Sequence, residues 1–311
     1  KFVGAMRTRG LMLVVHASVL LAIVAGVPLV SVEDPDFPVG PFTRALSSQS
    51  PMLRGNDVLI AQTLLARSPF VVGLEADGVF GAKSADAVSS FQKGNGLPVD
   101  GTLTAATAGV LLDKHSADGF VDDGQSAESQ GYLYKIIVPL HSNRSVEVMA
   151  ELLAANNTVL HRFRVRGHGE DTGPVKPWPV FNNTNPGRSE FASSGNTPTG
   201  LSEVDLNTPE EDPHLYGPYP INRVTTGLVG NAKLLMPGIR TGILLHTGEW
   251  PGWTPDQDMP NSAGCIHAHP TDIDTIAKIL SAEGVEIRKN PDHGGAYPYK
   301  PQGLIAVQLV D

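Results

Sequence analysis

The chain has 311 residues, enough for two domains with a sizeable core in each. Hydrophobic residues make up 41% of it and charged residues 18%, which is typical of a globular protein and not of a disordered one. The net charge is −9 and no lysine/arginine-rich block is present, so a nucleic-acid partner, which needs concentrated positive charge, is not expected. The 33 glycines and 25 prolines indicate many turns and a loop-rich, β-containing architecture.

The first residues have the pattern of an export signal. Arg7 and Arg9 precede an uncharged apolar stretch over 11–30, and the segment 31–36 after it is polar. We therefore predict a signal peptide over 1–31, which would place the rest of the chain outside the cytoplasm, secreted or in the cell-wall compartment. The apolar stretch approaches the length of a membrane-spanning helix, so an uncleaved anchor is the alternative. No other segment is long and apolar enough to predict membrane contact.

The chain has a single cysteine, Cys265. Exported proteins usually use cysteines in pairs, as disulfides. A lone cysteine cannot pair within its own chain, and an idle exposed thiol is open to oxidation. The residue is therefore either buried and inert or kept for its reactivity, and its neighbours decide between the two.

Residues 53–112 have the periodicity of a small helical domain. Apolar residues recur at helical spacing in three stretches: 58–65, 85–91 and 104–112. The pairs Asp77-Gly78 and Asp100-Gly101 precede the second and third of these stretches. In an Asp-Gly pair the glycine takes positive φ and the aspartate bonds nearby amides, so each pair predicts a tight turn.

The sequence of this segment resembles the peptidoglycan-binding domain family. The matching elements are Asp77-Gly78-Val79-Phe80-Gly81, Ala87-Val88, Phe91-Gln92, Asn95-Gly96-Leu97 and Val99-Asp100-Gly101. The resemblance implies a non-catalytic, all-α three-helix module that grips wall peptides or glycan, which makes peptidoglycan the predicted partner. A helical spacer without binding function is the alternative.

The chain then becomes polar and acidic over 113–131, which we interpret as a linker. Residues 132–140 and 158–165 are apolar and β-branched, as in strands. Between them, 146–153 fits a short helix or another strand. Residues 167–197 are rich in Gly, Pro, Asn and Ser and have no periodicity, so a long loop is expected there.

The residues around Cys265 suggest nucleophilic chemistry. A thiol attacks a carbonyl well only as the thiolate, so a nearby imidazole that takes its proton is the usual activator. His246 and His267 are the two candidate bases. Gly264, directly before the cysteine, lets backbone amides approach an oxyanion closely.

Two regular elements are expected to hold this site. An apolar strand over 241–245 ends on His246, and a helix follows the cysteine. Thr271 is the expected N-cap of that helix and Gly284 its end. Its apolar positions share one face: Ile273, Ile276, Ala277 and Leu280.

This constellation resembles the signature of the L,D-transpeptidases, in their YkuD-like catalytic domain. The matching elements are His246, the fifteen residues after it, Ser262-Ala263-Gly264-Cys265 and, upstream, Thr197-Pro198-Thr199-Gly200. The resemblance covers roughly 132–311, with a long insertion within the 167–197 loop. It implies a mostly β, sandwich-like α+β catalytic domain that uses no cofactor.

The resemblance also implies a role for each matching residue. Cys265 matches the nucleophile and His246 the general base. Gly264 and Cys265 match the positions whose amides form the oxyanion hole. Ser262 matches the hydroxyl position of the motif. Thr247 follows the base and is placed to help orient its ring.

Two positions depart from the family pattern. Ala263 stands where a histidine is frequent, and His267 stands where arginine or asparagine is usual, which makes His267 a candidate for substrate selection. Trp250 and Trp253 either line the substrate cleft or cap the sheet. His267 with His269 offers too few convergent ligands for zinc, so no metal is expected.

The implied reaction is acyl transfer through a thioester on Cys265. Its carbonyl lies between an L-centre and a D-residue of a peptidoglycan stem peptide. Transfer to an amine gives an L,D-type cross-link, whereas transfer to water makes the enzyme a carboxypeptidase. A wall-binding protein with a vestigial catalytic domain is the third hypothesis, and retention of Cys265 with His246 argues against it.

Overall fold

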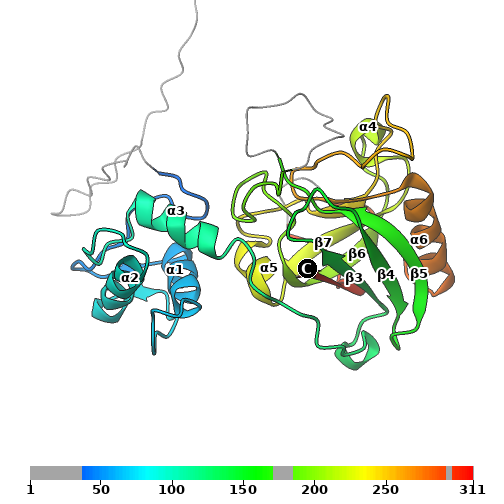
Figure 1. Cartoon of the computed structure of the whole chain (residues 1–311). Helices are drawn as coiled ribbons and strands as arrows, with labels where there is room; N and C mark the ends of the chain where they lie inside the picture. Colours follow the sequence, from blue (N-terminus) through cyan, green and yellow to red (C-terminus); the bar gives the residue numbers. More distant parts are fainter. Residues whose placement is uncertain (1–36, 171–184, 292–295, 311) are drawn as a thin grey trace, which may run out of the picture. The chain divides into compact units, whose positions relative to one another are not determined.

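The computed structural model of the chain describes residues 37–170, 185–291 and 296–310 (Figure 1). The signal peptide or anchor predicted over 1–31 lies outside this range. Within these three ranges, no helix combines the length and the apolar character that a bilayer crossing needs. A helical unit comes first along the chain, and a β-barrel follows it.

The helical unit contains the three expected helices and one short ribbon. Its elements are β1 (Leu53–Arg54), α1 (Asn56–Ala66), β2 (Val79–Phe80), α2 (Ala82–Gly94) and α3 (Ala105–Lys114). β1 and β2 pair antiparallel. The core of this unit also includes residues N-terminal to the predicted boundary at 53. Phe42 and Leu46 are fully buried in it, and the backbone of Leu46 pairs with that of Leu103.

The two Asp-Gly turns are each held by a buried glutamine. The Gln62 side chain accepts from the amides of Asp77 and Gly78 at 3.0 and 2.8 Å and donates to Asp77 Oδ1 at 2.9 Å. Gln92 repeats this arrangement on the second turn, with its amide donating to Asp100 Oδ1 at 2.8 Å. Each turn is thereby fixed against the helix before it, which explains why Asp-Gly recurs ahead of a helix.

The catalytic region is built on a single closed sheet of eight strands. They are β3 (Tyr134–Leu140), β4 (Val148–Ala154), β5 (Val159–Arg166), β6 (Gly200–Asn207), β7 (Ile221–Gly227), β8 (Leu244–His246), β9 (Ile266–Ala268) and β10 (Gly303–Leu309). Their order around the barrel is β10-β3-β4-β5-β9-β8-β7-β6. The expected sandwich-like arrangement is wrong, because β10 pairs with both β3 and β6 and so closes the sheet.

Three local expectations are settled by these elements. Residues 146–153, for which helix and strand were both open, contain β4. The expected strand over 241–245 is shorter, because β8 begins only at Leu244. The N-cap of α6 (Pro270–Ala282) is His269 and not Thr271. Pro270 has no N–H and fits the first helical position, so the His269 side chain caps the Thr271 amide instead.

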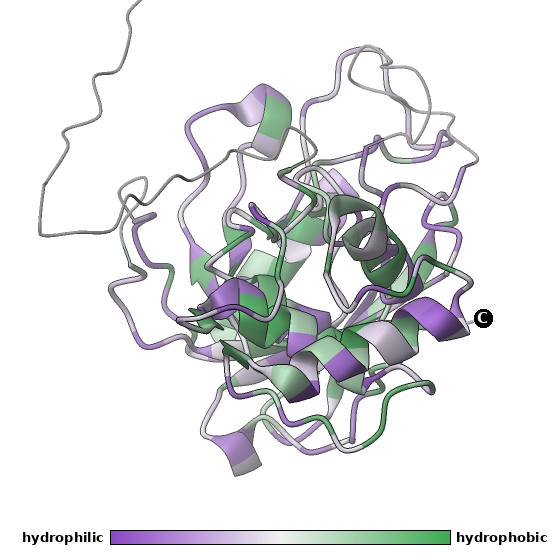
Figure 2. Cartoon of the chain, turned by 90° about the vertical axis from the view of Figure 1, so that its left-hand side faces the viewer, coloured by the Kyte–Doolittle hydropathy of each residue, from purple (hydrophilic) through white to green (hydrophobic). Residues whose placement is uncertain are grey.

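The helix α6 covers part of the barrel. Figure 1 shows it beside β5. Its predicted apolar face is buried: Ile273, Ile276 and Leu280 belong to the same core cluster as inward residues of the strands. In Figure 2 hydrophobic and hydrophilic residues alternate along the helices, as expected of helices that bury only one face. Two shorter helices, α4 (Pro213–Tyr216) and α5 (Gly230–Leu235), flank β7 along the chain.

The acidic segment 113–131 is attached to the barrel. After α3 it contains only the 3₁₀ turn η1 (Glu128–Gln130). The ammonium group of the buried Lys135 forms an ion pair with Asp122 and donates to the carbonyl oxygen of Gln125 at 2.9 Å. A lysine buried on a barrel strand needs such partners, so this contact explains part of the acidic character of the segment.

Candidate active site

The β8–β9 pair brings the predicted nucleophile and base to one face of the sheet. The two strands run parallel, with Leu245 beside Ile266 and His246 beside His267. Leu245 and Ile266 are fully buried in the barrel core. Because side chains alternate along a strand, His246, His267 and the preceding Cys265 project from the opposite face. Nineteen positions of sequence thus separate two side chains that lie on neighbouring strands.

The Cys265 thiol is a protonated group in a buried setting. Sγ donates to the carbonyl oxygen of Gly242 at 3.3 Å. Burial raises the pKa of the thiol to about 11, against the opposing effects of a backbone hydrogen bond from Leu244 and the charge of Arg240. At neutral pH the thiol therefore needs a base before it can attack a carbonyl.

His246 is a neutral imidazole with a defined tautomer. Its Nδ1 lies 2.5 Å from the carbonyl oxygen of Thr247, which can only accept a hydrogen bond. Nδ1 therefore carries the proton, and Nε2 keeps the lone pair that a general base needs. Burial lowers the pKa of His246 to about 4, so the ring is unprotonated at neutral pH.

The expected orienting effect of Thr247 comes from its carbonyl group. The Thr247 hydroxyl donates instead to the oxygen of Gly248, at 3.5 Å. In the described part of the chain, the Cys265 thiol is hydrogen-bonded to the Gly242 carbonyl and the His246 ring to the Thr247 carbonyl. The thiol and the imidazole are therefore not hydrogen-bonded to each other in this state. Such bonds often form only once substrate is bound.

Ser262 organises the loop before the nucleophile. Its Oγ accepts from the Gly264 amide at 3.0 Å and lies 2.8 Å from the Cys265 carbonyl oxygen. Thr197 donates to the carbonyl oxygen of Gly264 at 2.9 Å. The amide of Gly264 is thus engaged by Ser262 in this state, and the role of that amide in an oxyanion hole stays a prediction.

His267 lies buried between the rings of His246 and Trp250. Its ring centroid is 4.8 Å from that of His246 and 4.9 Å from that of Trp250. Its Nδ1 donates to the carbonyl oxygen of Pro260 at 2.8 Å. Trp250 is itself only 1% exposed, whereas Trp253 is partly exposed and donates to the Asp258 carbonyl oxygen. This geometry supports Trp250 as a packing residue and not as a cleft wall.

A cavity of about 610 Å³ opens beside the thiol. Its lining includes Gly242, which accepts from the thiol, and Leu244, which packs against Cys265. Tyr216, which also lines the cavity, packs against the cluster that contains Leu244 and Cys265, and its ring centroid lies 5.2 Å from that of His246. The lining includes neither Cys265 nor His246. His267, Trp250 and Trp253 are also absent from it, so their roles in substrate binding stay predictions.

Sequence reasoning missed the residues that frame this cavity. Tyr216 and Arg223 come from α4 and β7, which no motif marks. Arg240 gives a weak signal, because it is a charged residue shortly before the strand that ends on the base. These residues meet only because the barrel closes β7 against β8.

Two further histidines have separate partners. His161 Nε2 lies 2.8 Å from Asp272, and His269 caps α6. Across the described parts of the chain, no three His, Cys, Asp or Glu side chains converge as metal ligands do.

Comparisons with known proteins address both units. Residues 54–111 match the family model described as "Putative peptidoglycan binding domain", and residues 161–287 match that of the L,D-transpeptidase catalytic domain. No curated protein sequence matches the chain significantly.

Several solved structures are similar to this chain at low identity. The L,D-transpeptidase from Xylanimonas cellulosilytica is 17% identical, over 87% of this chain and 100% of its own, with a TM-score of 0.29. That from Stackebrandtia nassauensis is 14% identical, over 84% and 93%, with a TM-score of 0.27. The protein Bd1075 from Bdellovibrio bacteriovorus is 15% identical, over 59% and 50%, with a TM-score of 0.33. These scores are too low to support an argument, so the assignment depends on the family models. By that assignment, the chain carries a peptidoglycan-binding-type domain followed by an L,D-transpeptidase catalytic domain.

Proposed function

We propose that the chain is an exported cysteine acyltransferase that forms L,D-type cross-links in peptidoglycan through a thioester on Cys265. The observation that carries this proposal is that His246 on β8 and Cys265, directly before the adjacent strand β9, project from one face of the sheet. The thiol is hydrogen-bonded to Gly242, which lines the cavity. The L,D-transpeptidase domain and the peptidoglycan-binding domain supply the substrate class.

The first half-reaction is acylation. Nε2 of His246 takes the thiol proton as Sγ attacks the carbonyl carbon, and the carbonyl oxygen becomes an oxyanion. The imidazolium is held by the Thr247 carbonyl at Nδ1 and returns its proton to the departing amine of the D-residue. The C–N bond breaks and a thioester remains on Cys265.

The second half-reaction decides the activity. His246 removes a proton from an acceptor amine, which attacks the thioester, forms the new amide and releases the thiol. Water in place of the amine gives a carboxypeptidase. The cavity lining holds charged groups of both signs: Glu210, Glu211, Asp212, Arg223 and Arg240. This mixture does not decide between an amine and water as the acceptor.

Incubation of the full chain with a defined stem tetrapeptide tests the proposal. We expect mass spectrometry to show a dimer joined by a new amide, with loss of the terminal D-residue from the donor. A tripeptide without dimer identifies the carboxypeptidase. If neither product forms and Cys265 is never acylated, the chain is a wall-binding protein.

The helical unit is proposed to bind the wall. We expect a fragment spanning 37–116, which retains Phe42 and Leu46 in the core, to cosediment with insoluble peptidoglycan. Because this module carries few charges, binding should survive moderate salt better than a simple electrostatic contact would. Insoluble chitin is the matched control. A folded fragment that stays in the supernatant with peptidoglycan would make this unit a spacer.

A further inference from the structure

A buried guanidinium lies against the nucleophile loop. Arg240 is only 4% exposed and directs its terminal nitrogens at four backbone carbonyl groups. Nη1 donates to the oxygens of Glu190 at 2.9 Å and Asn196 at 2.7 Å. Nη2 donates to those of Gly195 at 3.0 Å and Ala263 at 2.8 Å. These four bonds use all four terminal N–H groups, so none remains for a substrate.

Gly264 is fitted to this guanidinium. A Cβ atom at Gly264 would lie 1.8 Å from Arg240 Nη2 and 3.0 Å from the carbonyl oxygen of Gly195. Its φ of +109° is also one that residues with side chains rarely adopt. The backbone directly before Cys265 therefore depends on the position of Arg240, and a glycine is required there for reasons of space as well as conformation.

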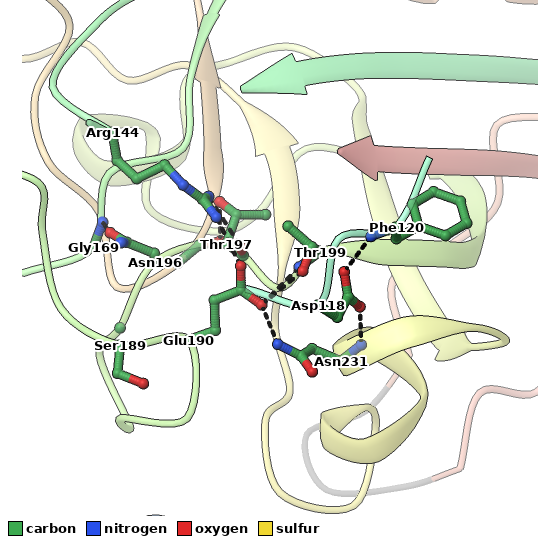
Figure 3. Close-up of polar contacts among 12 residues, drawn as sticks. Asp118, Phe120, Arg144, Gly169, Ser189, Glu190, Asn196, Thr197, Thr199 and Asn231 are labelled. Atoms are coloured by element: carbon green, nitrogen blue, oxygen red, sulfur yellow. Dashed lines mark hydrogen bonds and ion pairs between the residues drawn. The ribbon is translucent and has the colours of Figure 1, made fainter. Parts of the chain in front are cut away.

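The segment around Glu190, to which Arg240 connects the loop before Cys265, is itself held in place. Glu190, whose carbonyl accepts from Arg240, has a fully buried carboxylate. Figure 3 shows that carboxylate between Arg144, Thr199 and Asn231, with bonds of 2.7, 2.9 and 3.0 Å to them. Arg240 thus joins the loop before Cys265 to a segment whose own position is determined by a buried ion pair.

Arg240 also places a positive charge near the thiol. Burial lowers the pKa of its guanidinium to about 10, so the group remains a cation at neutral pH. Its charge favours the thiolate of Cys265. Arg223 acts in the same direction, but it forms an ion pair with Glu210, which opposes its effect. The carboxylate of Glu190 forms its ion pair with Arg144, whereas Arg240 contacts the carbonyl oxygen of Glu190.

We propose that Arg240 is a positioning residue for the acylation of Cys265. It holds residues 262–265 in place through Ala263, and its fixed charge stabilises the thiolate. This inference builds on the proposed function, because acylation is the step that Arg240 assists.

The pH dependence of Cys265 alkylation tests the role of the charge. Because Cys265 is the single cysteine, iodoacetamide labelling reports this thiol alone. We expect Arg240→Met to move the midpoint of the profile to higher pH and to slow labelling on the order of tenfold at a given pH below it. Arg288→Met is the matched control, since Arg288 is a partly buried arginine that bonds Asp205 and the Lys300 carbonyl. A folded Arg240→Met with the wild-type profile overturns the proposal.

Arg240→Lys separates the effect of the four hydrogen bonds from the effect of the positive charge. It also tests the proposal if Arg240→Met does not fold. Lysine keeps the charge but cannot direct four donors at four separate carbonyls. We expect the alkylation midpoint to stay near that of the wild type while acylation by a peptide donor falls at least tenfold. Wild-type acylation by Arg240→Lys overturns the positioning role. Failure of the proposed function has a different signature: the wild type is never acylated, while alkylation still differs between Arg240→Met and the wild type.

Discussion

Cys265→Ala is expected to abolish covalent capture of the substrate. The wild type should gain the mass of one acyl group when incubated with a tetrapeptide donor or a carbapenem, and the variant should gain none. The reason is that Sγ is the only thiol in the chain and lies beside both the cavity and the strand that carries His246. Intact-protein mass spectrometry measures the adduct directly.

The thermal stability of Cys265→Ala is the control that attributes loss of the adduct to loss of the thiol. Truncation to alanine removes the sulfur, its hydrogen bond to Gly242 and its packing against Ile221 and Leu244. We expect a modest fall in the thermal unfolding temperature of a variant that still folds. An adduct on Cys265→Ala would place the nucleophile elsewhere, and a wild type that forms none under active conditions would contradict the assignment.

The predictions that succeeded depend on local pattern. The three helices of the first unit and the buried face of α6 follow from apolar spacing, which the packed structure preserves. The closeness of the strands that hold His246 and follow Cys265 agrees with the spacing of the motif, whereas the catalytic roles of the two residues stay predictions. In each case the relevant contacts lie within one element or between neighbouring ones.

The features that escaped prediction arise from distant contacts. The barrel closes because β10, at the end of the chain, pairs with β3 and β6, and nothing in the local pattern of these strands distinguishes a barrel from a sandwich. The same holds for the site. Arg240 reaches residues that lie 44 and 50 positions before it and 23 after it, so no short motif could reveal its contacts.

The N-cap of α6 differs from the prediction because of the proline directly before Thr271. Thr271 and Asp274 fit a capping pattern, but the structure places Thr271 inside the helix behind Pro270. Threonine is a common cap and histidine is not, so composition favoured the wrong residue. The proline was the better signal, because it is strongly preferred at the first helical position.

His246→Ala should lower the rate of Cys265 acylation by a hundredfold or more, the usual loss when a general base is removed. His246 matches the base of the L,D-transpeptidase signature, and its Nε2 can accept a proton because its Nδ1 is fixed by the Thr247 carbonyl. The Nδ1 of His267 is fixed in the same way by the Pro260 carbonyl, so the two variants are needed to separate the rings. His267→Ala should retain substantial chemistry while changing substrate affinity or preference, because the position that His267 matches in the L,D-transpeptidase signature is not that of the base, and its ring packs against that of His246.

The pH profile of acylation by the wild type should reflect the pKa values of His246 and Cys265. Burial lowers the pKa of His246 to about 4 and raises that of Cys265 to about 11. A neutral imidazole beside a neutral thiol therefore persists across the neutral range, and single-turnover acylation should be level between about pH 5 and about pH 10. Below that plateau the imidazole gains a proton and can no longer serve as the base, so the rate should fall towards acid.

Single-turnover acylation across pH separates the two imidazoles. In His246→Ala the level region should disappear and the residual rate should rise with pH, since only the spontaneously formed thiolate can then react. In His267→Ala the level region should remain. His161→Ala is the matched control, because His161 is an ion-paired, partly buried histidine on β5 that stacks on Phe163. If His267→Ala loses the plateau while His246→Ala keeps it, then His267 is the base, and the Nδ1 contact of His246 with Thr247 serves only to pack the end of β8.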